Sequence, residues 1–448
     1  MSRQTSCGVG LVGAGVVGGG VAEVLLTRRG LLSKRSGVDI DLLMIADQDR
    51  ERALATGIDA GRVVGDFRHV VDNPDVAVVV ELIGGVGVAH EVVMAAIEAG
   101  KHVVTANKAL LAERGADIFA RAREKNVIVA FEASVAGGIP LLLALRDGLV
   151  ANRLDSLLGI VNGTCNHILS EMAAKGLPFS ECLAEAQRLG FAEADPSADI
   201  DGKDSGHKLA ILSALGFETW IDFGKLHIEG IRHIQDVDIN ITSALGYSLK
   251  LLGVIRTDPK PRSAAEGGSG GIGAGDRIFL SVHPALLRND NPLANVHGSL
   301  NAVETNGDVV MESVFYGRGA GRYPTASAVV SDIAAVAKAR AFGGGPAWFP
   351  PADNAYRLAP MDDYRTRYYL RFVVGDRSGV LGALATTLGR ENVSIAAMHQ
   401  FENTLADGVA SVCLLTHEAK EGDVKRALAG IAAFDFLAGE PTLIRIEG

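Results

Sequence analysis

The chain has 448 residues, enough for about three domains, and 48% of them are hydrophobic while only 5% are aromatic. This aliphatic composition favours α/β domains, and a formal net charge of −10 argues against a nucleic-acid partner, which calls for a basic face. The four cysteines show neither metal-site nor disulfide spacing, and the apolar runs are too short or too interrupted to span a membrane. We therefore expect a cytoplasmic protein with no targeting segment and no membrane segment.

The first 130 residues alternate between strand-like and helix-like segments. Helical patterns, among them 16–27 and 110–125, separate apolar strand-like runs at 7–12, 40–45, 76–83, 101–105 and 127–131. Strands separated by helices of this length predict a parallel, doubly wound sheet. The interpretation is an α/β chain whose residues 1–135 form a Rossmann-like dinucleotide-binding domain.

The middle of the chain, residues 136–342, has a different pattern, with helical segments followed by strands that alternate. The dipeptide Asn306-Gly307 lies between strand-like runs at 299–304 and 309–315, and it predicts a hairpin turn because both residues accept positive φ. This pattern is typical of an α+β domain, which we interpret as the substrate-binding and dimerisation domain. Residues 316–340 are expected to return to the first domain, and the Gly- and Ser-rich segment 263–275 is expected to be a loop.

The last part of the chain follows a segment rich in glycine and proline. Residues 343–365 are interpreted as a linker, and residues 366–448 show the order strand, helix, strand, strand, helix, strand. That order predicts a compact ferredoxin-like domain.

A GxGxxG pattern lies between the first predicted strand and the first predicted helix. There Gly13 permits a tight turn, Gly15 lets the backbone approach a pyrophosphate, and Gly18 allows close helix packing. A packing turn is the alternative, because the chain contains 54 glycines. The context favours dinucleotide binding through the loop and first helical turn, namely Gly13, Ala14, Gly15, Val16, Val17 and Gly18.

Asp47 ends the second predicted strand, where a carboxylate accepts a hydrogen bond from a ribose 2′-hydroxyl and repels a 2′-phosphate. It therefore favours NAD. Arg50 and Arg52 follow closely and suit a 2′-phosphate, so NADP stays open, and an ordinary loop carboxylate is the alternative for Asp47.

Polar residues follow two later strands of the predicted sheet. Thr105-Ala-Asn107-Lys108 ends one of them, at the edge where doubly wound sheets bind ligands, although lysines are also common on solvated surfaces. Residues 132–140 end another, and their glycines expose carbonyl groups that suit a cation or a cofactor.

The densest polar cluster spans residues 193–208. One glutamate and four aspartates fall within twelve residues ahead of an apolar helical pattern. Asp204 and Lys208 share a helix face, and as a simple salt bridge this pair would contribute only about 0.3–0.5 kcal/mol. The acidic density instead favours recognition of a substrate ammonium group. His207 points to another face of the helix, so we interpret it as structural.

Together these motifs resemble homoserine dehydrogenases over about residues 8–340. The resemblance also rests on three further stretches, Gly159-Ile-Val-Asn162-Gly163-Thr164, Gly190-Phe-Ala-Glu193-Ala-Asp195-Pro196 and Tyr316-Gly-Arg-Gly319-Ala-Gly321-Arg-Tyr-Pro324. It implies NAD(P)-dependent interconversion of L-homoserine and L-aspartate 4-semialdehyde, in the biosynthesis of threonine, methionine and isoleucine.

The resemblance implies roles for individual residues. Lys208 and Lys108 would flank the reacting carbon, with Lys208 as proton donor and acceptor and Asp204 positioning it. Substrate binding would involve four residues, Thr164, Glu193, Asp199 and Lys108. The cofactor would also contact Lys108 and Gly319, and a Na⁺ or K⁺ ion would be bound mainly by the carbonyl groups of Glu132, Val135, Gly137 and Ile139. Many relatives carry a basic residue where this chain has Ala46, which weakens the case for NADP.

The proton chemistry of a lysine limits this mechanism. A lysine that acts as a base at neutral pH needs a pKa lowered by about 3 units from about 10.4. Desolvation and a second lysine lower the pKa, whereas nearby carboxylates raise it. We therefore expect charged Lys208 to donate a proton to the aldehyde, and alcohol oxidation to improve at alkaline pH.

The C-terminal domain resembles an ACT domain in residues 374–381 and 393–400. The resemblance implies an amino-acid effector bound between paired domains, with L-threonine as feedback inhibitor, in a homodimer or homotetramer. Ser378 stands where proline is common, which leaves the ligand open. A purely structural oligomerisation domain is the alternative.

Two other functions fit part of the pattern. An amino-acid sensor would keep the Rossmann-like domain without turnover, but it would have no need of both Lys108 and Lys208. A dehydrogenase for another short amino alcohol stays open, because the acidic cluster does not define the length of the substrate.

Overall fold

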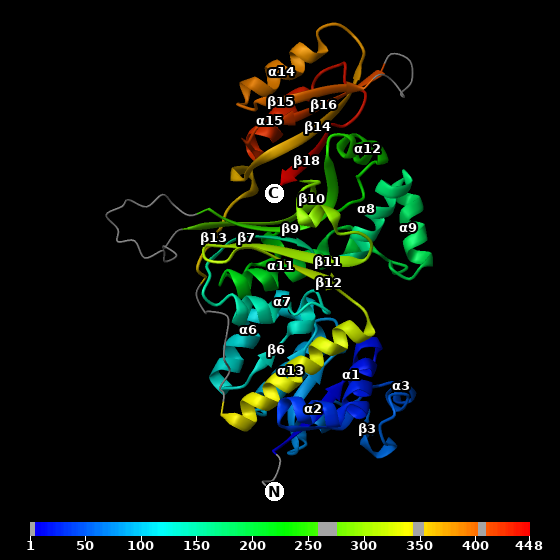
Figure 1. The fold of residues 1–448 in the computed structure, drawn as a ribbon, viewed down its shortest axis with the longest axis vertical. Helices are drawn as coiled ribbons and strands as arrows, with labels where there is room; N and C mark the ends of the chain where they lie inside the picture. The colour runs from blue at the N-terminus through cyan, green and yellow to red at the C-terminus, as the bar shows by residue number, and fades with distance from the viewer. Residues whose placement is uncertain (1–4, 259–275, 344–353, 402–408) are drawn as a thin grey trace, which may run out of the picture. The chain divides into compact units, whose positions relative to one another are not determined.

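The computed structural model describes residues 5–258, 276–343, 354–401 and 409–448 (Figure 1). The chain forms two compact units, which alternate along the sequence. The first unit comprises Met1–Gly163, Lys203–Leu226 and Ser299–Tyr356, and the second comprises Thr164–Gly202, His227–Gly298 and Arg357–Gly448. The loop expected at 263–275 and most of the Gly- and Pro-rich segment of the expected linker lie outside the described residues, and the domain boundaries drawn from the sequence remain predictions.

The first unit contains a six-stranded parallel sheet, as the sequence predicts. The strand order is β3-β2-β1-β4-β5-β6, and it reverses between β1 and β4, where doubly wound sheets open their ligand crevice. The strands are β1 (Ser6–Val12), β2 (Asp39–Ala46), β3 (Val63–Val64), β4 (Val76–Glu81), β5 (His102–Thr105) and β6 (Val129–Ala130).

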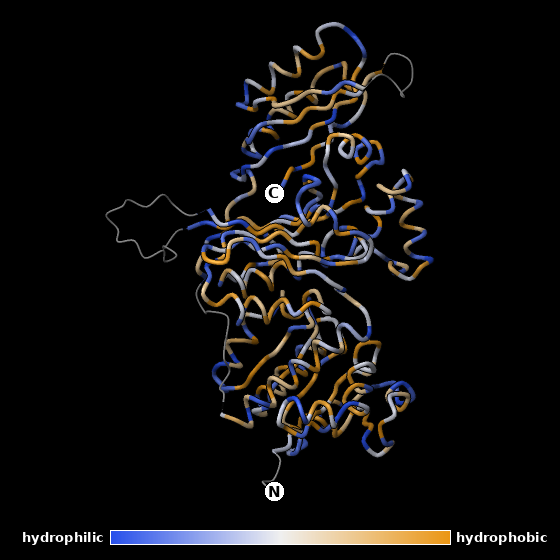
Figure 2. The backbone as a smooth tube through the Cα atoms, viewed as in Figure 1, coloured by the Kyte–Doolittle hydropathy of each residue, from blue (hydrophilic) through white to orange (hydrophobic). Residues whose placement is uncertain are grey.

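Helices flank this parallel sheet and bury its apolar strands. They are α1 (Val16–Thr27), α2 (Arg29–Ser36), α3 (Arg50–Leu54), α4 (Arg68–Asp72), α5 (Gly87–Glu98), α6 (Lys108–Lys125) and α13 (Arg322–Phe342). Helix α13 lies alongside α1 (Figure 1), and a Cβ atom on Gly20 would come within 3.3 Å of Ala326 Cβ. Figure 2 shows hydrophobic residues along the strands, whereas the segment around α3 is hydrophilic. A single apolar core therefore joins α1, α13 and the sheet.

The first unit also contains three antiparallel strands and several further helices. The strands are β7 (Leu154–Ile160), β11 (Leu300–Gly307) and β12 (Met311–Arg318), in the order β12-β11-β7. The helices are α7 (Leu141–Leu143), which leads into a π-helical turn at Ala144–Gly148, and α11 (Lys203–Gly216), which packs against α6.

The hairpin between β11 and β12 forms, but the predicted position of its turn is wrong. Asn306 and Gly307 are still paired across the hairpin, and the turn falls at residues 308–310, with positive φ at Met311. The turn residues bond to a neighbouring segment, because the Val310 N–H donates to Asn152 Oδ1 (2.7 Å) and Arg153 bonds Asp308 (2.9 Å). These tertiary bonds outweigh the local preference of Asn-Gly for a two-residue turn.

The second unit begins with helices and continues into a mixed sheet. The helices are α8 (Gly163–Lys175), α9 (Phe179–Arg188), α10 (Ser197–Ile200) and α12 (Asp236–Ala244), and the strands are β8 (His227–Ile228), β9 (Tyr247–Asp258), β10 (Arg277–Arg288) and β13 (Arg357–Leu358). Strands β9 and β10 pair antiparallel along their full length, and β8 and β13 each add a short parallel pairing to β10.

The C-terminal part of the second unit has the predicted ferredoxin-like order. Its elements are β14 (Arg365–Gly375), α14 (Val380–Arg390), β15 (Ile395–Phe401), β16 (Val409–Thr416), the short β17 (Ala419–Lys420), α15 (Glu421–Ile431) and β18 (Thr442–Glu447). The strand order is β18-β14-β16-β15, and α14 packs against α15. One feature was not predicted, namely that β18 also pairs in parallel with β10, with Arg445 opposite Ala285. This part of the chain therefore shares a sheet with β9 and β10.

None of the described helices combines the length and the apolar character that crossing a membrane requires.

Candidate active site

The glycine loop after β1 has the geometry that dinucleotide binding requires. Gly13 has a φ of +97°, and a Cβ atom there would lie 2.8 Å from Leu82 O. A Cβ atom on Gly18 would lie 1.9 Å from Gly13 O, so only glycine lets the helix begin this close to the loop. Among the described residues, and apart from its two chain neighbours, nothing lies within 4 Å of the position that a Cβ atom on Gly15 would take, which leaves that backbone open to a phosphate.

A groove of about 650 Å³ runs along this loop, lined by the ends of β1, β2 and β4. Asp47 lies in it, and its carboxylate accepts hydrogen bonds from the Ala14 N–H (2.6 Å) and the Asp49 N–H (2.8 Å). Arg52 lines the same groove and pairs with Asp49 at 3.0 Å. The groove therefore offers both a carboxylate for a ribose hydroxyl and a cation near it.

Asp204 binds both lysines that the sequence singles out. Its Oδ2 atom lies 2.7 Å from Lys208 Nζ, and its Oδ1 atom lies 3.2 Å from Lys108 Nζ. Asn162, just after β7, donates its side-chain amide to Asp204 Oδ2 at 2.9 Å. Lys208 also donates to the carbonyl oxygen of Val161 at 2.6 Å. Three segments far apart in the sequence thus meet at one carboxylate.

Local hydrogen bonds hold Lys108 at the start of α6. Asn107 caps this helix by accepting from the Leu110 N–H (3.1 Å), and its amide donates to Gly85 O (2.7 Å). The hydroxyl of Thr105 donates to the buried Glu81 carboxylate at 2.7 Å. The end of β5 and the loop after β4 therefore fix the point from which Lys108 reaches Asp204.

The charges around Asp204 decide its protonation. Burial alone would raise the pKa of Asp204, but the nearby ammonium groups of Lys208 and Lys108 and the bonds from Lys208 and Asn162 lower it well below its usual range. Asp204 is therefore an anion across the working pH range. Two ammonium groups share one carboxylate, so the centre carries an excess of positive charge that suits a developing alkoxide.

His207 lies next to this centre, and its side chain packs against an aromatic ring. Its ring stacks on Phe223, with centroids 4.4 Å apart, and burial lowers its pKa.

The other residues expected to bind substrate belong to the second unit. Thr164 lies in the first turn of α8 and donates its hydroxyl to Phe191 O at 2.8 Å. Glu193 is exposed in the loop after α9, and its carbonyl accepts a bond from Gln187. Asp199 lies in α10, and its carbonyl oxygen accepts from the Cys165 thiol at 3.2 Å. Each is held by neighbours within that unit.

The turn at residues 132–139, where the sequence predicts a cation, borders a small cavity beside the buried Glu132. The N–H groups of Gly137 and Gly138 bond the carbonyls of Gly319 (3.0 Å) and Arg318 (2.9 Å). Ala136 has a φ of +49°, and the turn borders a cavity of about 210 Å³. The buried Glu132 carboxylate accepts from the N–H groups of Leu142 and Leu143. Oxygen atoms are the ligands that hard cations prefer, so the residue types of this turn are compatible with the predicted Na⁺ or K⁺ ion.

Comparisons with known proteins agree with the family resemblance of the sequence. Residues 13–132 match the family model "Homoserine dehydrogenase, NAD binding domain", residues 140–334 match "Homoserine dehydrogenase", and residues 368–433 match "ACT domain". The homoserine dehydrogenase of Neisseria gonorrhoeae is 46% identical over 98% of both chains, and that of Pseudomonas aeruginosa is 44% identical over 98% of both. The chain belongs to the homoserine dehydrogenase family. A crystal structure of a homoserine dehydrogenase from Thiobacillus denitrificans matches with a TM-score of 0.90 at 42% identity, covering 99% of this chain and 98% of that one.

Membership in the homoserine dehydrogenase family makes the chain an NAD(P)-dependent oxidoreductase with a C-terminal ACT domain.

One residue near the expected cation turn was not predicted from the sequence. Asp332 of α13 is buried in the same cavity, and its carboxylate accepts from the Glu132 N–H at 2.8 Å. Burial and the negative charge of Glu132 raise the pKa of Asp332 to about 8. The sequence signal that could have identified Asp332 is the position of an aspartate on the apolar face of a predicted helix.

Proposed function

We propose that the chain interconverts L-homoserine and L-aspartate 4-semialdehyde, with Lys208 transferring the proton, in the biosynthesis of threonine, methionine and isoleucine. The observation that carries this proposal is one buried carboxylate, Asp204, shared by the ammonium groups of Lys208 and Lys108. An aldehyde oxygen that receives a hydride on its carbon needs a proton from a positioned donor. Lys208, held at two points, is such a donor.

The nicotinamide, when bound, gives a hydride to the aldehyde carbon or accepts one from the alcohol carbon. Lys208 Nζ bonds Asp204 Oδ2 and Val161 O, so one of its three N–H groups remains for the substrate oxygen. In the reductive direction that N–H gives up its proton as the carbonyl becomes an alcohol. In the oxidative direction the neutral amine accepts the proton, so oxidation improves at alkaline pH.

The remaining residues are assigned to the substrate and the cofactor. Lys108, more exposed than Lys208, would approach the other side of the reacting carbon and contact the cofactor together with Gly319. The substrate would contact three further residues, Thr164, Glu193 and Asp199. The carboxylates of Glu193 and Asp199 suit its ammonium group. The loop from Gly13 to Gly18 would bind the pyrophosphate, and Asp47 favours NAD by accepting from a ribose hydroxyl.

A cation and an effector complete the proposal. Na⁺ or K⁺ would be bound by carbonyl groups of the turn that contains Glu132, Val135, Gly137 and Ile139. L-Threonine would bind the ACT domain as feedback inhibitor. Because ACT domains pair, the protein would act as a homodimer or homotetramer.

The test follows the absorbance of reduced nicotinamide at pH 7.5 and pH 9. Purified protein is mixed with L-homoserine and NAD⁺ or NADP⁺, in sodium or potassium buffer, with and without L-threonine. We expect homoserine-dependent reduction that is faster at pH 9 and with NAD⁺, and slower with L-threonine. L-Serine, which is one carbon shorter, is the control for substrate length. An absence of reduction in every buffer would overturn the assignment.

A further inference from the structure

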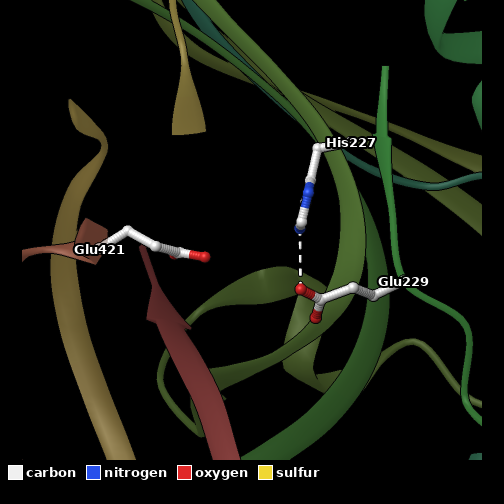
Figure 3. Close-up of side chains that lie close together, drawn as sticks. All are labelled: His227, Glu229 and Glu421. Atoms are coloured by element: carbon white, nitrogen blue, oxygen red, sulfur yellow. Dashed lines mark hydrogen bonds and ion pairs between the residues drawn. The ribbon is translucent and has the colours of Figure 1, made fainter. Parts of the chain in front are cut away.

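Strand β18 carries a buried arginine in a cluster outside the candidate active site. The Arg445 side chain is 1% exposed and bonds Glu229 through two N–H groups, both at 2.8 Å. It also bonds the fully buried carboxylate of Glu421 on α15, at 2.7 Å through Nε. Figure 3 shows Glu229, Glu421 and His227 converging on one point, with His227 Nε2 2.8 Å from Glu229 Oε1.

These three side chains do not form a metal site. Their ligand atoms lie within 4.8 Å of one another, a spacing that suits a metal ion. However, an N–H of Arg445 lies near all three, including His227 Nε2 at 3.4 Å. A metal ion there would have to displace a guanidinium that cannot lose its charge. The cluster is therefore an ion-pair network that holds Glu229.

The backbone after Glu229 packs directly on the segment that contains Asp199. A Cβ atom on Gly230 would lie 2.1 Å from Ile200 O and 2.6 Å from Asp201 Cα, so the two backbones touch with no side chain between them. The Ile231 N–H donates to Ile200 O at 2.8 Å. Any shift of Glu229 is therefore transmitted to α10.

Two further contacts join the same segments. Arg232 pairs with Asp201 and donates to Ser197 Oγ at 3.1 Å. A Cβ atom on Gly202 would lie 3.0 Å from Ile228 and 3.3 Å from Glu229 O. Residues 197–202 are thus fixed at both ends by residues 228–232, which Arg445 holds in turn.

We propose that Arg445 is a positioning residue, which acts through Glu229 to fix residues 197–202 and with them Asp199. This inference rests on the proposed role of Asp199 in binding the substrate ammonium group. Because Arg445 and Glu421 belong to the C-terminal ferredoxin-like part, a ligand that shifts this part changes the affinity for homoserine by the same contacts. Arg445 therefore sets the Michaelis constant rather than the rate of the chemical step.

The decisive variant is Glu229→Gln, which keeps the shape of the side chain but removes its charge. We expect the KM for L-homoserine to rise about 5- to 10-fold, within the range of couplings carried through packed networks. The kcat and the KM for the nicotinamide should stay within about twofold of the wild type. Gly230→Ala should raise the same KM at least as much, because its Cβ atom forces residues 197–202 to move.

The matched control is Asp238→Asn, which also removes one charge from a buried arginine pair of the second unit, with Arg371. It should lower the melting temperature as much as Glu229→Gln while leaving the KM for L-homoserine unchanged. An equal rise in KM in the control, or no rise in both Glu229→Gln and Gly230→Ala, would overturn the proposal.

Amide hydrogen exchange separates this inference from the proposed function. In the full chain, Glu229→Gln should speed exchange in a peptide that spans residues 197–202, and Asp238→Asn should not. If the wild type does not oxidise homoserine but exchange responds in this way, the function fails while the positioning role stands. Unchanged exchange in Glu229→Gln, with normal turnover by the wild type, refutes the positioning role alone.

Discussion

The Asp204 centre and the Arg445 cluster are both networks of buried charges, but the central group is an anion in the first and a cation in the second. At the first, one carboxylate serves two lysines, and the Lys108 side chain is 41% exposed. At the second, one arginine serves the carboxylates of Glu229 and Glu421, and Glu421 is fully buried. The first network surrounds an anion and is partly open, whereas the second surrounds a buried cation. Lys425, 46% exposed, also reaches Glu421 Oε1 at 3.3 Å from the edge of the second network.

The residue types explain what each network can do. A lysine ammonium can lose a proton, and Lys208 keeps one N–H free of protein acceptors among its described contacts. An arginine stays charged, and its planar fork bonds carboxylates in a fixed geometry. The Asp204 centre is therefore suited to proton transfer, and the Arg445 cluster is suited to holding segments in place.

The largest expected effect comes from removing the transferable proton. Lys208→Ala should lower kcat about 10²–10⁴-fold, the usual contribution of a general acid–base group, while cofactor binding measured by fluorescence survives. Lys208→Arg should be nearly as inactive, because a guanidinium keeps the positive charge but does not give up its proton near neutral pH. Lys203→Ala, an exposed lysine on the same helix, is the matched control. Normal turnover in Lys208→Ala would exclude Lys208 from the mechanism.

The next effect concerns stability at the other network. Arg445→Met should lower the free energy of unfolding by about 3–5 kcal/mol, because Glu421 and Glu229 lose their buried partner. Burial would raise the pKa of Glu421, but its bond to Arg445 lowers it overall. The stabilisation that the charged Glu421 contributes is therefore complete above its pKa in the unfolded chain, near 4.5. It is lost as the pH falls through the lower pKa of Glu421 in the folded protein.

Urea denaturation at pH 7.5 and at pH 3.5, which lies below the unfolded pKa of Glu421, measures this difference. The deficit of Arg445→Met should be larger at pH 7.5, and adding Glu421→Leu should recover part of it at that pH. A deficit that is equal at both pH values would show that Arg445 contributes packing rather than charge.

Local patterns were enough to predict much of the fold and part of the site. The glycine loop, the parallel sheet and the pairing of Asp204 with Lys208 follow from spacings within a few residues, where periodicity reports directly on geometry. The order of elements in the ferredoxin-like part was readable for the same reason. The roles assigned to Thr164, Glu193 and Asp199 stay predictions, since they came from family resemblance.

Contacts between segments that are far apart in the sequence could not be predicted from local spacing. Asp332 meets Glu132 across 200 residues of sequence, and Arg445 meets Glu229 across 216. The apolar alternation of β18 predicts a strand but not that β10 is its second neighbour. At the hairpin, bonds from Asn152 and Asp308 shifted the turn away from Asn306-Gly307. Tertiary partners decided each of these features.

The smallest effect comes from Lys250, a buried lysine on β9 that belongs to neither type of network. Its Nζ donates to Val296 O at 2.6 Å, and no carboxylate in the described part of the chain pairs with it. Burial lowers its pKa to about 8, from 10.5. Because the unfolded chain binds the proton more tightly between these values, stability should rise as the pH increases from about 8 to about 10.5.

Lys250→Met removes this dependence. Between pH 7.5 and pH 10.5, the free energy of unfolding of the wild type should rise by about 3 kcal/mol relative to that of the variant, since each pKa unit corresponds to about 1.4 kcal/mol. Lys338→Met, at an exposed lysine of α13, should show no such gain. If stability changes with pH in the same way in the wild type and in Lys250→Met, then folding does not lower the pKa of Lys250. A measured gain would show that burial without a paired carboxylate is enough to lower the pKa of a lysine in this chain to about 8.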